Sequence, residues 1–180
     1  KNDRAHGHGK YFSIDGSMYE GQFEDDKQDG EGAEAWPDGS RYEGQYSNGL
    51  KHGRGRFSWA DGSSYEGDLV DNTLHGKGHY RFNGGREHHG QWHKNRMHGE
   101  GTFTWTDGRS YQGQYAEDAK DGHGIFRWPD GRVYDGQWKG GRQHGAGLHT
   151  TALGERRRGV WRHGERVSGS DADIPLVSEH

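Results

Sequence analysis

The sequence predicts an all-β protein: a single elongated, twisted antiparallel sheet of 23-residue β-hairpin repeats that forms an open, solenoid-like rod. Three observations lead to this prediction. Glycine supplies 34 of the 180 residues, aromatic residues make up 12%, and hydrophobic residues of all kinds reach only 26%. The glycines and aromatics recur at a fixed spacing, and they alternate with polar residues. Because each glycine costs a helix ~1 kcal/mol relative to alanine, this composition excludes a helical bundle.

The repeat keeps a strict register along the chain. Steps of 23 residues from Tyr19 meet no insertion or deletion, and they reach Tyr42, Tyr65, His88, Tyr111, Tyr134 and Arg157. Four columns of this frame hold 28 of the 34 glycines, and four others hold 21 of the 22 aromatic residues. Such internal periodicity is typical of proteins built from stacked supersecondary units.

Each repeat contains two short predicted strands. In residues 42–46 two tyrosines and a glycine share one face, and in residues 55–59 a glycine, a phenylalanine and a tryptophan do the same. Tight turns such as residues 37–40 join the strands, because glycine supplies a positive φ and proline presets φ near −65°. The other connection, for example residues 47–52, is predicted to be a longer polar loop that ends in His-Gly or Asp-Gly.

Glycine on the aromatic face predicts how the core is built. A glycine within a strand marks a place where another group approaches closely, so we expect rings to lie flat across the glycine columns. Each ring buries ~150–250 Å², which replaces the missing aliphatic residues in a core one ring thick. Stacking of the repeats then buries a continuous stripe. About thirteen or fourteen strands at a spacing of ~4.8 Å predict a curved rod roughly 65 Å long.

The recurring Tyr-Glu-Gly-Gln-aromatic, followed by Gly-x-Gly-x-aromatic-x-Trp and Asp-Gly, resembles the MORN (membrane occupation and recognition nexus) repeat. The resemblance covers residues 6–167, with six full copies and a partial copy at each end. Two copies depart from the pattern, with His88-His89 and Arg157-Arg158 in place of Tyr-Glu. Ser168 replaces a repeat glycine, so we expect the array to end there and residues 168–180 to form a flexible or partner-bound tail.

The resemblance implies a non-catalytic scaffold in a cytoskeletal, ciliary or axonemal, or membrane-cortex assembly. Some members dimerise through the ends of the sheet, and some are the targeting part of a larger enzyme, so both alternatives stay open. The expected compartment is intracellular: cytoplasm, cytoskeleton or cilium. The sequence has no cysteine, which agrees with a reducing cytosol, and no apolar stretch approaches the ~18 residues of a membrane span.

The polar residues predict neither a catalytic site nor a metal site nor a cofactor. One column at the end of the polar loop holds five histidines: His6, His52, His75, His98 and His144. Equivalent residues of consecutive hairpins lie roughly 10 Å apart, too far to share a zinc ion. Asp29 and Asp121 occupy the same column, so its side chains are predicted to accept backbone hydrogen bonds. The same spacing is too wide for the paired carboxylates of a retaining glycosidase.

The aromatic face is the predicted partner-binding surface. A one-layer sheet leaves this face uncovered, and apolar patches above a few hundred Å² usually mark interaction sites. We therefore expect a helical or extended segment of a partner protein to lie along the aromatic groove. The predicted central anchors lie midway to late in the array, and they are Trp92, Trp105, Tyr111, Trp128 and Tyr134.

A cluster of arginines near the C-terminus supports an alternative function. The cluster consists of Arg156, Arg157, Arg158, Arg162 and Arg166. Charged side chains on a terminal strand discourage further strand pairing, which is one interpretation. The other is a peripheral membrane module, because arginine binds the phosphates of anionic lipids through two parallel hydrogen bonds. Nucleic acid is not an expected partner, since the isoelectric point is about 6.4 and no basic stripe runs along the array.

Overall fold

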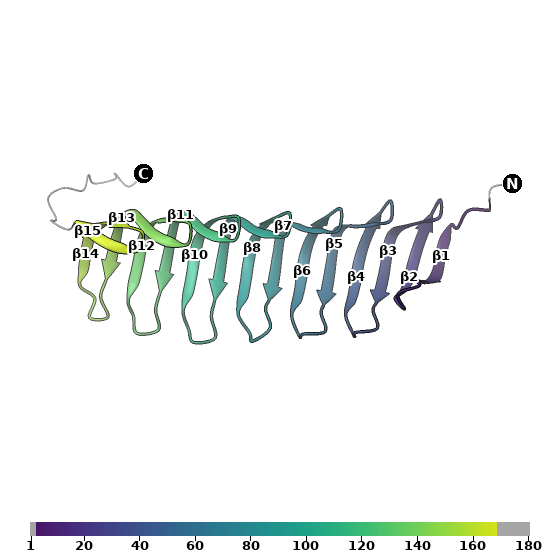
Figure 1. Ribbon diagram of the computed structural model, residues 1–180, viewed down its shortest axis with the longest axis horizontal. Helices are drawn as coiled ribbons and strands as arrows, with labels where there is room; N and C mark the ends of the chain where they lie inside the picture. Colours follow the sequence, from purple (N-terminus) through teal and green to yellow (C-terminus); the bar gives the residue numbers. More distant parts are fainter. Residues whose placement is uncertain (1–2, 169–180) are drawn as a thin grey trace. The chain divides into compact units, whose positions relative to one another are not determined.

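The computed structural model describes residues 3–168, which form fifteen β-strands and contain no α-helix. The strands follow one another in chain order in an antiparallel sheet, each hydrogen-bonded to its neighbours in the sequence (Figure 1). They are β1 (Gly7–Phe12), β2 (Met18–Glu24), β3 (Lys27–Ala35), β4 (Arg41–Ser47), β5 (Leu50–Ser58), β6 (Ser64–Val70), β7 (Thr73–Arg81), β8 (Glu87–His93), β9 (Arg96–Thr104), β10 (Ser110–Ala116), β11 (Ala119–Arg127), β12 (Val133–Lys139), β13 (Arg142–Thr150), β14 (Arg156–Arg162) and β15 (Glu165–Ser168).

This topology confirms the predicted antiparallel sheet of hairpin repeats. The chain divides into two compact units, Lys1–Arg96 and Met97–His180. The length and curvature of the predicted rod stay predictions. The predicted tail, residues 168–180, lies outside the described residues except for Ser168, at which β15 ends.

The two kinds of connection between strands are exchanged relative to the prediction. Between β4 and β5, the site of the predicted longer loop, the chain reverses in the two residues Asn48 and Gly49, whose φ angles are 50° and 84°. Two positive φ angles are the mark of a type I′ turn, which matches the twist of paired strands. His52 and Gly53, the predicted loop end, belong to β5. Glycine, Asn and Asp tolerate the left-handed conformation, so the turn needs only two residues.

The predicted tight turn is the longer connection. Between β3 and β4 the chain uses residues 36–40, in which the Trp36 N–H donates to the Ser40 carbonyl at 3.0 Å and the Gly39 N–H donates to the Trp36 carbonyl at 3.0 Å. The carboxylate of Asp38 accepts the Ser40 N–H at 2.8 Å, a side-chain hydrogen bond within the same loop. Because successive strands are antiparallel, the five-residue loops lie at one end of the strands and the two-residue turns at the other end within each unit.

Tyrosine rings lie across glycines, as the sequence predicts. Tyr42 and Tyr111 are completely buried, and a Cβ atom added to Gly55 or to Gly124 of the neighbouring strand would overlap the corresponding ring. Tyr19, Tyr65 and Tyr134 repeat this arrangement over Gly32, Gly78 and Gly147. The glycine columns therefore provide the space in which the core tyrosines lie.

A β-bulge in the hairpin of β4 and β5 orients the buried Tyr42. The pairing of β4 with β5 shifts its register between Gly44 and Tyr46, so Gln45 is the extra residue. The Tyr42 hydroxyl donates to the Gln45 carbonyl at 2.9 Å, and the Gln45 side-chain oxygen accepts the Arg54 N–H at 2.8 Å. The same pair of bonds recurs around Gln22, Asp68 and Gln114. The bulge residue thus stabilises both the ring and the next strand.

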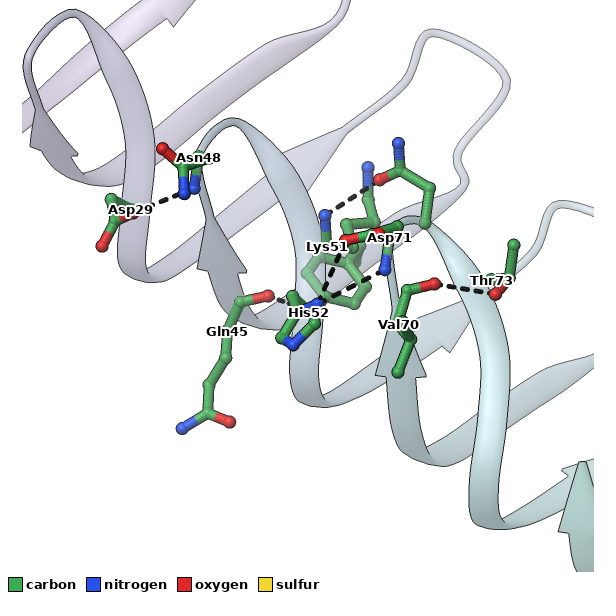
Figure 2. Close-up of polar contacts among 10 residues, drawn as sticks. Asp29, Gln45, Asn48, Lys51, His52, Val70, Asp71 and Thr73 are labelled. Carbon is green, nitrogen blue, oxygen red and sulfur yellow. Dashed lines mark hydrogen bonds and ion pairs between the residues drawn. The ribbon is translucent and has the colours of Figure 1, made fainter. Parts of the chain in front are cut away.

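In the loop-end column, the side chains of His6, Asp29, His52 and Asp121 accept hydrogen bonds from the turn of the following hairpin, as predicted. Figure 2 shows Asp29 accepting the Asn48 N–H and His52 beside Asp71. The distances are 2.9 Å to the Asp29 carboxylate and 3.4 Å from the Asp71 N–H to the His52 ring nitrogen Nδ1. Asp121 accepts the Gly140 N–H in the same way at 3.2 Å. Within residues 3–168 no three His, Asp or Glu side chains form a group that could hold a metal ion.

His88 occupies a tyrosine position of the frame. It is completely buried, and its ring meets the Trp92 ring edge to face at 5.2 Å with an interplanar angle of 86°. This contact copies that of Tyr134 with Trp138, whose centroids lie 5.3 Å apart at 88°. His88 is therefore a variant of the repeat start, as the sequence predicts.

Candidate partner-binding face

A ridge of half-buried rings runs along one face of each unit. These residues form the fourth aromatic column of the repeat, and we call them the aromatic ridge: Trp36, Trp59 and Phe82 in the first unit, Trp105 and Trp128 in the second. Four of the five ridge rings pack on the ring two residues earlier in the chain, as Trp59 stacks on Phe57 at 5.0 Å and 6°. Trp36 is the exception, because Glu34 stands two residues before it. Offset stacks and edge contacts of this kind each add ~0.5–1.5 kcal/mol beyond the area that they bury.

The ridge of the second unit rests on buried core rings. In the second unit, Trp105 lies 4.5 Å from Phe103 and 5.5 Å from Phe126, measured between ring centroids. Trp128 lies 4.5 Å from Phe126. Phe103 and Phe126 are themselves buried, at 7% and 6% exposure. The ridge rings are therefore held in place from beneath while their outer surfaces remain partly exposed.

The five predicted anchors fall into two groups. Trp105 and Trp128 belong to the aromatic ridge and are partly exposed. Tyr111 and Tyr134 are completely buried, and Trp92 is 6% exposed, its indole N–H donating to the Gly78 carbonyl at 3.3 Å. The sequence places all five in aromatic columns but does not separate the columns by exposure. Only the first group offers surface for direct contact with a partner, and the second group belongs to the buried core.

In the first unit a lysine on the ridge face has a carboxylate partner. Lys51 Nζ lies 2.6 Å from Glu34 Oε2, and the two side chains are only 14% and 16% exposed. The Tyr46 hydroxyl also donates to this carboxylate, at 3.1 Å. The ammonium group lies 5.1 Å from the Trp36 ring centroid and 5.3 Å from that of Tyr42. The ion pair is therefore enclosed by rings.

In the second unit Lys120 lies on the ridge face among four rings. The distances from its Nζ to the ring centroids are 5.6 Å for Trp105, 5.5 Å for Tyr111, 5.7 Å for Phe126 and 5.3 Å for Trp138. Burial, and to a lesser degree the neighbouring Arg109, lowers the pKa of the Lys120 ammonium group. Cation–π attraction to the four ring faces offsets part of that cost.

A cleft of about 320 Å³ lies at the C-terminal end of the second unit. Burial is the main cause that lowers the pKa of His149 in this cleft, and the positive charges of Arg132, Arg157 and Arg166 lower it further. The Arg132 guanidinium lies 5.0 Å from the centroid of the Trp128 ring. The residues that line the cleft are Trp128, Arg132, Gln143, His149, Arg157, Trp161 and Arg166. It combines aromatic walls with positive charge.

Strand β14 divides the predicted arginine cluster between the two faces of the sheet. Side chains alternate along a strand, so Arg157 shares a face with Trp161, whereas Arg156, Arg158 and Arg162 lie on the opposite face. Arg157 and Arg166 line the cleft, and an Arg166 N–H donates to the Arg158 carbonyl. The structure therefore brings together two of the five predicted arginines.

Sequence reasoning missed Arg132 and His149 in this cleft. Their signal is present in the frame, because His149 stands in the ring column of Phe126 and Arg157 stands in the tyrosine column of Tyr134. Two ring positions of the last repeat thus carry cationic or titratable groups. Departures from the repeat pattern that are adjacent in register, as His149 and Arg157 are in β13 and β14, could have identified the cleft.

The family model of the MORN repeat matches the chain in seven segments. They are residues 1–18, 19–41, 42–64, 65–85, 88–108, 111–131 and 134–152. A search of curated proteins finds no match. Across the described residues, no helix is long and apolar enough to cross a membrane.

Several solved structures of CPAP and SAS-4 domains are similar to this chain at low identity. The TCP domain of Drosophila melanogaster SAS-4 (dCPAP), solved with a proline-rich motif of Ana2 (dSTIL), has a TM-score of 0.47 and 12% identity over 86% of this chain and 90% of that chain. The TCP10 domain of Danio rerio CPAP, solved with a STIL peptide, has a TM-score of 0.33 and 13% identity over 84% and 68%. The G-box domain of the microcephaly protein CPAP has a TM-score of 0.39 and 14% identity over 87% and 100%.

Proposed function

We propose that this chain, which belongs to the MORN repeat family, is a non-catalytic interaction scaffold that binds a helical or extended segment of a partner protein along its aromatic ridge. The observation that carries the proposal is the partly exposed ridge, which in the second unit packs on the buried rings of Phe103 and Phe126. All strands of residues 3–168 belong to one sheet, so no second layer of strands covers this face. An uncovered row of aromatic rings is a surface that protein partners commonly bury.

Trp105 and Trp128 are the proposed direct anchors in the second unit. Tryptophan buries a large apolar area and loses few rotatable bonds on binding, which is why it is enriched among interface residues that dominate affinity. Trp92, Tyr111 and Tyr134 are buried in the core. Their substitution would alter folding as well as binding, so they are unsuitable as first tests.

Peptide selection with the full chain tests the proposal. Displayed random peptides about 12 residues long span about 40 Å when extended, and they sample many side-chain patterns in one experiment. We expect selected peptides to lose about tenfold or more in affinity for Trp105→Ala or Trp128→Ala, as measured by fluorescence anisotropy. Phe12→Ala is the matched control, because Phe12 is 70% exposed and lies outside the repeat columns. Peptides that are insensitive to both tryptophan substitutions would contradict the proposal.

The proposed setting is a cytoskeletal or ciliary assembly in the cytoplasm. This part of the proposal rests on the family resemblance, and imaging of the tagged chain in a ciliated cell tests it. Accumulation in a compartment without cytoskeletal structures would contradict it. The chain can also act as the targeting part of a larger enzyme, in which case the same ridge would select the location of a catalytic domain elsewhere.

We also propose residues 6–167 as the repeat array, residues 168–180 as a flexible tail, and the sheet ends as a homodimer contact. Limited proteolysis tests the boundary, since cleavage confined to the segment after Ser168 is the expected result. Sedimentation equilibrium tests the dimer. The described end strands β1 and β15 each have one edge that lacks a neighbouring strand in the strand order. A concentration-dependent mass that disappears when an end strand carries proline would support pairing there.

A second candidate function is binding of anionic phospholipids at the C-terminal cleft. The observation that favours it is the convergence of Arg132, Arg157 and Arg166 on one cleft. Flotation with phosphatidylcholine vesicles with and without phosphatidylinositol bisphosphate tests this candidate. Arg157→Ala and Arg166→Ala should each reduce binding, whereas Arg156→Ala on the opposite face is the matched control of equal charge. Equal losses from all three substitutions would indicate general attraction and no specific cleft.

A further inference from the structure

Lys51 and Lys120 occupy the same position of the repeat, three 23-residue steps apart. Their surroundings correspond, because Trp36 and Tyr42 beside Lys51 match Trp105 and Tyr111 beside Lys120. The chain therefore contains two versions of one enclosed cation, one in each unit. They differ in what neutralises the charge.

The charge of Lys51 is neutralised by a carboxylate of the same chain, whereas Lys120 has no such carboxylate among the described residues. Glu34, which lies 2.6 Å from Lys51, corresponds to Phe103 in the repeat frame. In the part of the chain from residue 3 to residue 168, no carboxylate lies within ion-pairing distance of Lys120. Four other copies place a neutral residue at this position, Gln28, Leu74, Met97 and Gln143, and the partial last copy places Arg166 there. A cation is thus not required there for folding.

The electrostatics around Lys120 favour an incoming anion. Its ammonium group carries three N–H donors, and the faces of the four surrounding rings satisfy them only weakly. The burial that lowers the pKa of this group also weakens its hydration. The nearby Arg109 is already paired with Asp107 at 2.7 Å, so it adds positive charge without supplying an acceptor. A carboxylate placed on Lys120 would restore the arrangement that Glu34 gives to Lys51.

We propose that Lys120 receives the carboxylate of an Asp or Glu side chain from an extended partner segment lying along the ridge of the second unit. This inference rests on the proposed function, and it adds the chemistry of the partner: an acidic residue flanked by apolar ones. A protein carboxylate fits because the chain itself uses one at the equivalent site, where the pair is enclosed by aromatic rings. The flanking apolar residues would contact Trp105 and Trp128.

The test uses peptides selected from the displayed random library with the full chain. Each acidic residue of a selected peptide is changed to its amide, and both forms are titrated against wild type, Lys120→Met and Lys120→Arg. The loss of one charge-assisted hydrogen bond should weaken binding to wild type by about 10- to 100-fold. On Lys120→Met the same change should matter by less than about twofold, because the paired groups are coupled. Lys120→Arg should restore sensitivity to the acid.

Lys139→Met is the matched control for the change in net charge. Lys139 is exposed in β12, and its substitution should leave the acid dependence of the peptide unchanged. Lys120→Met should fold, since Met97 fills the same position naturally. The proposal is overturned if the acid-to-amide change costs the same on Lys120→Met as on wild type.

The outcomes separate this inference from the proposed function. Peptides that depend on Trp105 or Trp128 but tolerate the loss of their acidic residues would contradict the role of Lys120 and leave the ridge as a binding surface. A selection that yields no peptide sensitive to the ridge tryptophans would overturn both. Peptides that depend on an acidic residue and on Lys120 together support the inference.

Discussion

The ring of Tyr42 lies across Gly55, and no side chain larger than hydrogen fits at that glycine. The contact joins β4 to β5 of one hairpin. It recurs in the other described repeats that begin with tyrosine, so it defines the core of this sheet.

Substitution of a ring-covered glycine should strongly destabilise the fold. In Gly55→Ala the new methyl group would overlap the Tyr42 ring, and forcing extra volume into a packed core costs ~1–3 kcal/mol. Urea unfolding measures the loss of free energy. Gly9→Ala is the control, because its Cβ would meet Phe23 at an ordinary contact distance of 3.5 Å. Similar losses in both variants would argue against the ring-on-glycine core.

The protein should lose stability at alkaline pH. Burial is the main cause that raises the pKa of Tyr42 and of Tyr134 from 10.0 to about 12. Between these values the unfolded phenols release protons that the folded ones keep, so the unfolded state is favoured as pH rises from 10 toward 12. Unfolding midpoints across this interval, together with phenolate absorbance, check the prediction. A midpoint that stays constant through the interval would contradict it.

The two enclosed lysines should respond oppositely to neutralisation. Lys51→Met leaves the Glu34 carboxylate without its cation at 16% exposure, and we expect a loss of about 2 kcal/mol. Lys120→Met removes a desolvated charge that has no described carboxylate partner, so stability should stay equal or rise. Thermal melting of the two variants provides the comparison. A larger loss from Lys120→Met than from Lys51→Met would refute this account of the ridge electrostatics.

The loop-end histidines should act as hydrogen-bond acceptors and not as metal ligands. His52→Asn should be tolerated within about 0.5 kcal/mol, because its amide oxygen can accept the Asp71 N–H without adding a carboxylate beside Asp71. His52→Ala removes the acceptor and should cost about 1 kcal/mol. Removal of metal ions with a chelator should leave the melting temperature unchanged. A melting temperature that falls on chelation and recovers with zinc would show instead that the column binds metal.

The sequence is sufficient to predict the core but not the connections. Tyr42 and Gly55 can be placed on one face from their period of two, since side-chain alternation is a local property. The rule that glycine breaks strands assigns His52 and Gly53 to a loop, whereas here they continue β5. The turn itself needs only Asn48 and Gly49, and both can adopt positive φ. Asn48-Gly49 and His52-Gly53 are both glycine-containing turn signals, and local rules do not decide which of them forms the turn.

The candidate site is predictable only in part. The aromatic columns identify Trp105 and Trp128, but the exposure of each column depends on which ring lies beneath which, and that is set by packing between strands. The repeat frame also places Lys120 in line with Lys51. Its enclosure by four rings could not be foreseen, because those rings come from residues 105 to 138 and converge only in the folded unit.

The bulge residue Gln45 stabilises one hairpin through hydrogen bonds between residues that are close in sequence. Its carbonyl accepts from Tyr42, three residues earlier, and its side chain accepts from Arg54, nine residues later. The turn bonds extend only to the next hairpin, 19 to 21 residues away. Folding can therefore spread from hairpin to hairpin with little loop-closure entropy at any step. A gene encoding such a chain can gain or lose one 23-residue segment by unequal recombination and still specify every remaining contact.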